Sequence, residues 1–259
     1  MSLPILTVEL IEAFILAFVR ISGMLIMIPV FGDKVVPGAI KWGLSLLLTM
    51  ILFPLIRTSI PPLGDLEFLP LALNIAGELL IGIIIGFTAK LIFAGVQLAG
   101  EMLGFQMGFS IANVIDPITN LQISTVAEFY YLLAALLFLT VDAHHIFITA
   151  IAESYRLVTP LSGHFSGELV QTLTNLSQAV FIIAIKVSAP VMAVLLFTNV
   201  AMGVVARTVP QMNVFMVAFP LQIAIGFIFL GLTAPVFVKL VQGFFFRFAG
   251  DIHMLLRIM

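Results

Sequence analysis

Six long apolar runs dominate the chain and restrict it to very few folds. A helix needs about 20 mostly apolar residues to span a bilayer, and each run is long enough or nearly so. They occupy residues 8–29, 40–60, 69–98, 123–141, 176–202 and 213–241. The runs are apolar throughout and lack the alternation of a lipid-facing barrel strand. The sequence therefore predicts an all-α membrane protein with about six long hydrophobic helices.

The composition excludes an ordinary soluble domain. Hydrophobic residues make up 62% of the 259 residues and charged residues 9%, whereas soluble domains have about 45–50% and about 25%. The 11 basic and 13 acidic residues include no basic tract, which argues against a nucleic-acid partner. The absence of cysteine excludes disulfides, thiolate metal sites and cysteine nucleophiles. Residues 1–7 have no basic segment, so we expect the first run to remain as a spanning helix.

The chain shows no repeat and no low-complexity tract, so we expect a single helical membrane domain over residues 1–259. Within it, residues 243–259 are predicted to form an amphipathic C-terminal helix. The apolar face of that tail carries Phe245, Phe248, Ile252, Leu255 and Met259. An anchor at the membrane surface is the favoured interpretation, and a docking helix for another subunit is the alternative.

Seven ionisable residues lie well inside the apolar runs or, for Glu101, in the continuation of the third run. They are Glu12, Arg20, Glu78, Lys90, Glu101, Glu128 and Lys186. Each costs about 2.5–3.5 kcal/mol at a bilayer centre, so none should face lipid. We expect them to pair with neighbouring helices or subunits, with Glu78, Lys90, Glu101 and Lys186 as buried charges. A pair of Lys186 with Glu78 is one such arrangement, and an ion or substrate path is the alternative.

Glycines recur at four-residue spacing within and beyond the third run. They are Gly82 and Gly86, followed by Gly100, Gly104 and Gly108. Small residues at this spacing allow the backbones of two helices to approach closely. The run also continues past residue 98 without a breaker, so we expect one long, tightly crossed helix.

The densest polar cluster of the sequence is Asp142, His144 and His145. On a regular helix only Asp142 and His145 would share a face, and the adjacent histidines would point about 100° apart. We therefore expect no metal ion and no other cofactor here. Nucleophile elbows and phosphate-binding loops are missing as well, so the sequence does not predict an enzyme.

The connection after the third run is apolar and then ends in Asp116-Pro117, which stops a helix. Irregular backbone at membrane depth is tolerated only where protein buries it or where it lines a cavity. Met107 and Phe109 would be deformable fillers of such a narrow space. This pattern predicts a plug or a constriction, and a fixed packing wedge is the alternative.

These residues together resemble a known family. The features that carry the resemblance are Pro29-x-Phe31, Pro37, Gly77-Glu78, Gly100-Glu101, Gly104-x-Gln106-Met107-Gly108-Phe109, Asp116-Pro117 and Phe138…Asp142-x-His144. They are similar to the flagellar biosynthetic protein FliR family, which belongs to the type III secretion export gate. The similarity extends from about residue 20 to residue 241, and residues 97–145 are its specific part.

The resemblance implies a core subunit of the flagellar type III export gate, without enzymatic activity. In that family the chain assembles with FliP and FliQ subunits, near FlhB and FlhA, into a closed pore. The complex lies in the bacterial inner membrane at the flagellar basal body and passes unfolded flagellar proteins. The family's loop at 106–122 fills the pore, which gives the plug candidates Gln106, Met107, Phe109, Ser110, Asn113, Asp116 and Pro117.

Two other functions remain open from the residues alone. The first is a small-solute secondary transporter with Glu78, Lys90 or Lys186 as its coupling residues. The inverted repeats and paired broken helices typical of such transporters are not evident in the sequence. The second is an intramembrane hydrolase built around Asp142, His144 and His145.

Overall fold

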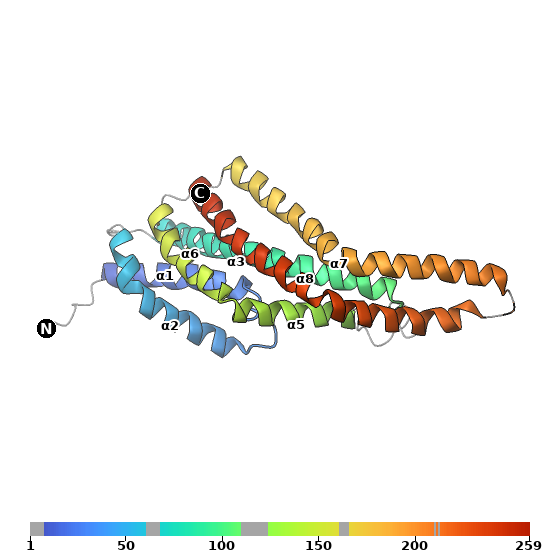
Figure 1. Ribbon diagram of the computed structural model, residues 1–259. Coiled ribbons are helices and arrows are strands. Elements are labelled where there is room, and N and C mark those ends of the chain that lie inside the picture. Colours follow the sequence, from blue (N-terminus) through green and yellow to red (C-terminus); the bar gives the residue numbers. More distant parts are fainter. Residues whose placement is uncertain (1–7, 61–67, 110–123, 161–165, 210, 212) are drawn as a thin grey trace. The chain divides into compact units, whose positions relative to one another are not determined.

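The computed structural model describes residues 8–60, 68–109, 124–160, 166–209, 211 and 213–259, which contain helices but no β-strand. Its α-helices are α1 (Val8–Met27), α2 (Gly38–Ile56), α3 (Phe68–Gln106), α5 (Thr125–Thr140), α6 (Ala143–Leu157), α7 (Gly167–Thr208) and α8 (Val214–Ile258) (Figure 1). A short 3-10 helix, η1 (Arg57–Ser59), follows α2. The prediction of an all-α protein is confirmed.

Five of these helices are long and apolar enough to cross a membrane, namely α1, α2 with η1, α3, α7 and α8. A sixth span exists if α5 and α6 count as one broken span. This agrees with the six runs predicted from the sequence. The fourth run is the exception in length, because α5 has only 16 residues and ends at Thr140.

Three helices run far beyond the ends of the predicted runs. α3 has 39 residues, α7 has 42 and α8 has 45. The expected continuation of the third helix is confirmed, since α3 ends at Gln106. The tail predicted as a helix of its own is the end of α8, which passes through Gly243 because a single glycine costs a helix only about 1 kcal/mol.

Contacts within the chain gather into two compact units. Unit 1 comprises Met1–Leu91, Asp142–Leu176 and Phe246–Met259. Unit 2 comprises Ile92–Val141 and Ser177–Phe245. The helices α3, α7 and α8 each contribute one part to both units.

In unit 1, α1 and the first part of α3 cross at very short range. A Cβ atom added at Gly86 would lie 2.6 Å from the carbonyl oxygen of Met24, and one at Gly82 would collide with the carbonyl of Arg20. Only glycine allows this approach, as the four-residue spacing predicted. α2 packs against α1 and α6.

The end of α8 also belongs to unit 1 and packs there on α6. The rings of Phe147 and Phe248 lie 4.9 Å apart, and His253 forms an ion pair with Glu153 at 3.0 Å. Phe248, Ile252 and Leu255 are buried. The apolar face of the tail is therefore covered within the chain, which leaves little of it for a membrane surface or another subunit.

In unit 2, the second part of α3 is surrounded by α5, α7 and α8. A Cβ at Gly100 would lie 2.5 Å from the Cα of Ala127 on α5, and one at Gly95 would lie 2.8 Å from Ile183 on α7. The rings of Phe93, Phe138 and Phe245 form an aromatic cluster with centroid distances of 5.5–5.8 Å. Gly104 also packs closely, against Ser124.

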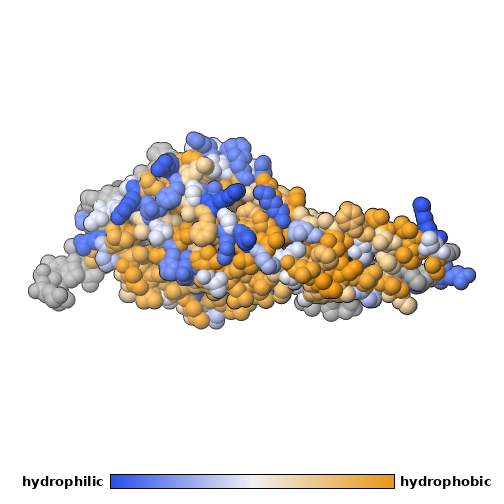
Figure 2. All heavy atoms as spheres, viewed as in Figure 1, coloured by the Kyte–Doolittle hydropathy of each residue, from blue (hydrophilic) through white to orange (hydrophobic). Residues whose placement is uncertain are grey.

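Large apolar side chains remain on the outside of both units. On α2, for example, Trp42, Leu47, Met50 and Ile51 are exposed. Figure 2 shows how much of the visible surface is hydrophobic, including the stretch that α2 occupies. A surface of this kind requires lipid or other protein as its neighbour.

Candidate functional site

A fully buried ion pair joins α1 to α3 in unit 1. The guanidinium of Arg20 is 0% exposed, and Glu78 is 2% exposed. The Nε of Arg20 donates to Oε2 of Glu78 at 2.6 Å, and Nη2 donates to Oε1 at 2.8 Å. This two-pronged geometry is the strongest form of an arginine–carboxylate contact.

α6 supplies the remaining partners of the Arg20 guanidinium. Nη1 donates to Oγ of Ser154 at 3.0 Å, and Nη2 donates to the carbonyl of Val158, just after α6, at 3.1 Å. The guanidinium carbon lies 3.9 Å from the centre of the Tyr155 ring, which adds a cation–π contact. Four of the five N–H donors of an arginine are thus used.

The sequence indicated that Arg20 and Glu78 must be shielded from lipid, but it did not identify their partners. A pair of Glu78 with Lys186 was one of the predicted arrangements. In the structure, both carboxylate oxygens of Glu78 instead accept hydrogen bonds from Arg20. Ser154 and Tyr155 were not predicted at all. The only available signal was that two opposite charges each interrupt an apolar run.

The other charges expected to be buried lie on the surface of the described chain. Lys90 and Glu101 on α3, Glu128 on α5 and Lys186 on α7 are all exposed. Glu12 on α1 is half-buried, and its Oε2 is buried without a hydrogen-bond partner in the described residues. Their shielding by other subunits stays a prediction.

The last turn of α3 has a defined cap. The amide of Phe109 donates to the carbonyl of Gly104 at 3.0 Å, and that of Gly108 donates to Phe105 at 3.1 Å. This is the Schellman arrangement, in which the residue after the helix adopts a left-handed conformation. Gly108 has φ 89° and terminates α3, and a Cβ added there would also lie 2.8 Å from the ring of Phe219 on α8.

Two of the plug candidates pack firmly against α8. Met107 is 0% exposed, and its Cε would lie 2.6 Å from a Cβ added at Gly226. The ring of Phe109 meets that of Phe227 edge-on at 6.2 Å. Both contacts lie in unit 2, and they are compatible with the start of a plug as well as with a fixed packing wedge, so both interpretations stay predictions.

A cavity of about 690 Å³ adjoins this capped end of α3. It is lined by Met102, Phe105, Gln106, Gly108, Met192, Asn199, Phe219 and Gln222. The amides of Gln222 and Asn199 are hydrogen-bonded across α7 and α8. The Oε1 of Gln106 is buried without a hydrogen-bond partner in the described residues. The remaining plug candidates, Ser110, Asn113, Asp116 and Pro117, lie outside the described residues.

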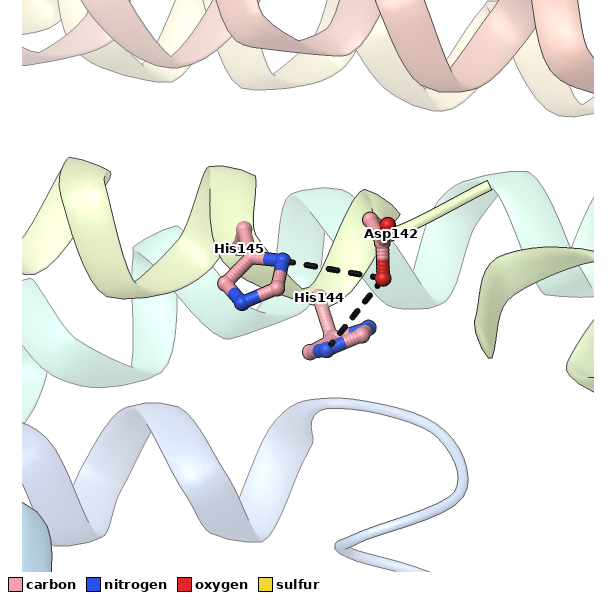
Figure 3. Close-up of side chains that lie close together, drawn as sticks. All are labelled: Asp142, His144 and His145. Carbon is pink, nitrogen blue, oxygen red and sulfur yellow. Dashed lines mark ion pairs between the residues drawn. The ribbon is translucent and has the colours of Figure 1, made fainter. Parts of the chain in front are cut away.

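Asp142, His144 and His145 come together where α6 begins in unit 1 (Figure 3). Their nearest nitrogen and oxygen atoms all lie within 4.8 Å of one another. Helical spacing did not predict this because Asp142 is not helical: it precedes α6 with φ 56° and ψ 25°. The left-handed turn points its carboxylate at both imidazoles (Figure 3).

Comparison with known proteins places the chain in one family. It matches the family described as bacterial export proteins, family 1, over residues 11–248. The chain belongs to this family. It is 39% identical to the flagellar biosynthetic protein FliR of Bacillus subtilis (strain 168), with 92% of each chain covered.

Further FliR relatives have lower identity over similar lengths. The FliR protein of Pectobacterium carotovorum subsp. carotovorum is 31% identical, with 88% of this chain and 86% of the relative covered. That of Escherichia coli (strain K12) is 29% identical, with 90% and 89% covered. The FliR resemblance expected from the sequence is confirmed. The match to the export family spans the positions of Arg20, Glu78 and the Asp142 turn.

Proposed function

We propose that this chain is a core subunit of the flagellar type III protein export gate. It forms and closes a channel for unfolded flagellar proteins in the bacterial inner membrane, at the base of the flagellum. Its partners are FliP and FliQ, with FlhB and FlhA nearby. The observation that carries this proposal is the match to export proteins over residues 11–248, which includes residues of both units.

The charges exposed within the spans support an assembly. Lys90, Glu101 and Lys186 lie in the apolar helices α3 and α7, and all three are on the surface. A charged residue at membrane depth normally faces protein or water. Neighbouring subunits that contribute opposite charges would satisfy these residues, together with the buried oxygen of Glu12.

The connection 106–122 is proposed to close the channel. An export channel must retain ions when idle, because one charge crossing 100 mV releases about 2.3 kcal/mol. Apolar side chains seal a pore by excluding water, and they yield to a passing chain more readily than a salt-bridged gate. In this proposal Met107 and Gly108, which pack closely on α8, anchor the start of the plug.

The alternative of a small-solute transporter is not favoured by these observations. Glu78, the first coupling residue considered, is held by Arg20 in a two-pronged contact and is almost fully buried. A carboxylate that must bind and release an ion needs access to water. The named relatives are flagellar biosynthetic proteins, and the matching family is one of export proteins.

Co-purification tests the assembly directly. The chain, carrying a Strep tag, would be expressed with FliP and FliQ of its own host and purified in mild detergent. We expect one large complex that contains all three proteins on a native gel. Lys186→Ala should release FliP and FliQ, whereas Leu232→Ala, at an exposed apolar position of α8, serves as the matched control. A chain that stays alone in the presence of both partners would contradict the proposal.

A further inference from the structure

We propose that Asp142, His144 and His145 form a binding site for a divalent transition-metal ion such as Zn²⁺. The ligands would be Oδ1 of Asp142, Nε2 of His144 and Nδ1 of His145 (Figure 3). The two nitrogens lie 3.9 and 3.7 Å from the same carboxylate oxygen. Two imidazoles and one carboxylate form a ligand set that suits zinc and its neighbours in the first transition row.

The backbone fixes the three side chains on one short turn. Asp142 occupies the position before the first residue of α6, where an aspartate normally accepts a hydrogen bond from the helix amides. Here its side chain makes no such bond, and its backbone has the left-handed φ of 56°. A non-glycine residue in this conformation is uncommon and concentrates at functional positions.

The rest of the turn is anchored by packing. Ala143 and Phe147 are buried, and the amide of His145 donates to the carbonyl of Asp142 at 3.0 Å. These contacts determine which way α6 presents its first turn. The imidazoles are consequently held side by side, with ring centres 4.3 Å apart.

The distances suit a shared ion better than direct contacts. Separations of 3.7 and 3.9 Å are too long for N–H···O hydrogen bonds. Three ligands bound to zinc at about 2.0–2.1 Å in a tetrahedral site lie about 3.3 Å from one another. The three ligand atoms lie within 4.8 Å of one another, so binding requires them to move closer by side-chain rotation. Asp142 and His145 have room for this, because their side chains are 70% and 64% exposed. The fourth position would be taken by water.

Binding of Co²⁺ provides the test, since this ion replaces Zn²⁺ and reports its coordination through visible absorption. The full-length chain, with a Strep tag instead of a histidine tag, would be titrated with Co²⁺ in detergent and then with competing Zn²⁺. We expect one saturable Co²⁺ site per chain, which Zn²⁺ displaces. Affinity should fall as pH is lowered, because imidazole must lose its proton to bind a metal.

Three variants should weaken Co²⁺ binding by at least about tenfold: Asp142→Asn, His144→Ala and His145→Ala. Asparagine tolerates the left-handed conformation, so Asp142→Asn removes the charge without disturbing the turn. The control is His253→Ala, which changes an exposed histidine on α8 paired with Glu153 and should leave the affinity unchanged. Each variant must elute from gel filtration as the wild type does. Absence of a saturable site, or equal affinity in the His144→Ala/His145→Ala double variant, would overturn the proposal.

Discussion

Replacement of Glu78 by glutamine should destabilise unit 1 strongly. The substitution keeps the size of the side chain but removes the charge that balances Arg20, which has no access to water. Leaving one member of a buried ion pair without its partner costs about 3–5 kcal/mol. For a chain of this size about 2–4 °C of melting temperature corresponds to 1 kcal/mol, so Glu78→Gln should melt about 6–20 °C lower.

A double variant that removes both charges should be more stable than either single variant. Arg20→Met/Glu78→Leu removes both charges and fills the space with apolar atoms, an exchange that is often neutral or stabilising in buried pairs. It should recover most of the stability that either single change loses. Ser154→Ala, which removes one acceptor of the guanidinium, should cost about 1–3 kcal/mol.

A fluorescent-protein fusion gives the measurement. Membranes would be solubilised and heated in steps, and the surviving folded fraction would be quantified by fluorescence-detected gel filtration. Glu101→Gln is the matched control, because Glu101 lies on the same helix but is exposed, and it should stay within about 0.5 kcal/mol of wild type. Two results would contradict this account: a Glu78→Gln melting temperature equal to that of the wild type, or a double variant that melts no higher than the single ones. In either case Glu78 would not be needed to compensate the buried charge of Arg20.

Three further changes probe the helix crossings, the wedge and the assembly. Gly100→Ala should lower the melting temperature of the chain because its Cβ would meet the backbone of Ala127, whereas Gly77→Ala, in open space on the same helix, should be neutral or slightly stabilising. Met107→Ala should cost about 2–5 kcal/mol as a cavity mutation, and normal stability combined with ion leakage would favour a plug at this position instead. Deletion of residues 110–120 should leave the complex assembled but leaky, seen as conductance in bilayers, and loss of the complex without a leak would contradict the plug.

The sequence predicted the helices well because each apolar run carries its own signal. Length and hydropathy alone determine that residues 69–98 span a membrane, and the absence of a breaker extends α3 to Gln106. The same local information predicted the close approach at Gly86 and Gly100, since glycine spacing is a property of one helix. Features that depend on a single turn or a single run could therefore be predicted from the sequence.

The pairing of side chains could be predicted from the sequence only in part. Arg20 and Glu78 are 58 positions apart, and their contact depends on how α1 and α3 cross, which no local pattern specifies. At Asp142 the rule of helical spacing failed because this residue lies between α5 and α6 and has a positive φ. The cap formed by Gly108 was not predicted, because its place in a four-residue series indicated only close packing.

The length of α8 has a consequence for how the chain is made. Its 45 residues correspond to about 68 Å along the helix axis, more than twice the roughly 30 Å of a hydrocarbon core. Lipid can therefore cover only part of it, yet large apolar side chains are exposed from Met216 through Phe246. A newly synthesised copy without its partners would expose apolar side chains to water, which makes it a substrate for quality-control proteases. The cell must then produce this chain in step with whatever covers it, and an excess of the chain alone should be short-lived.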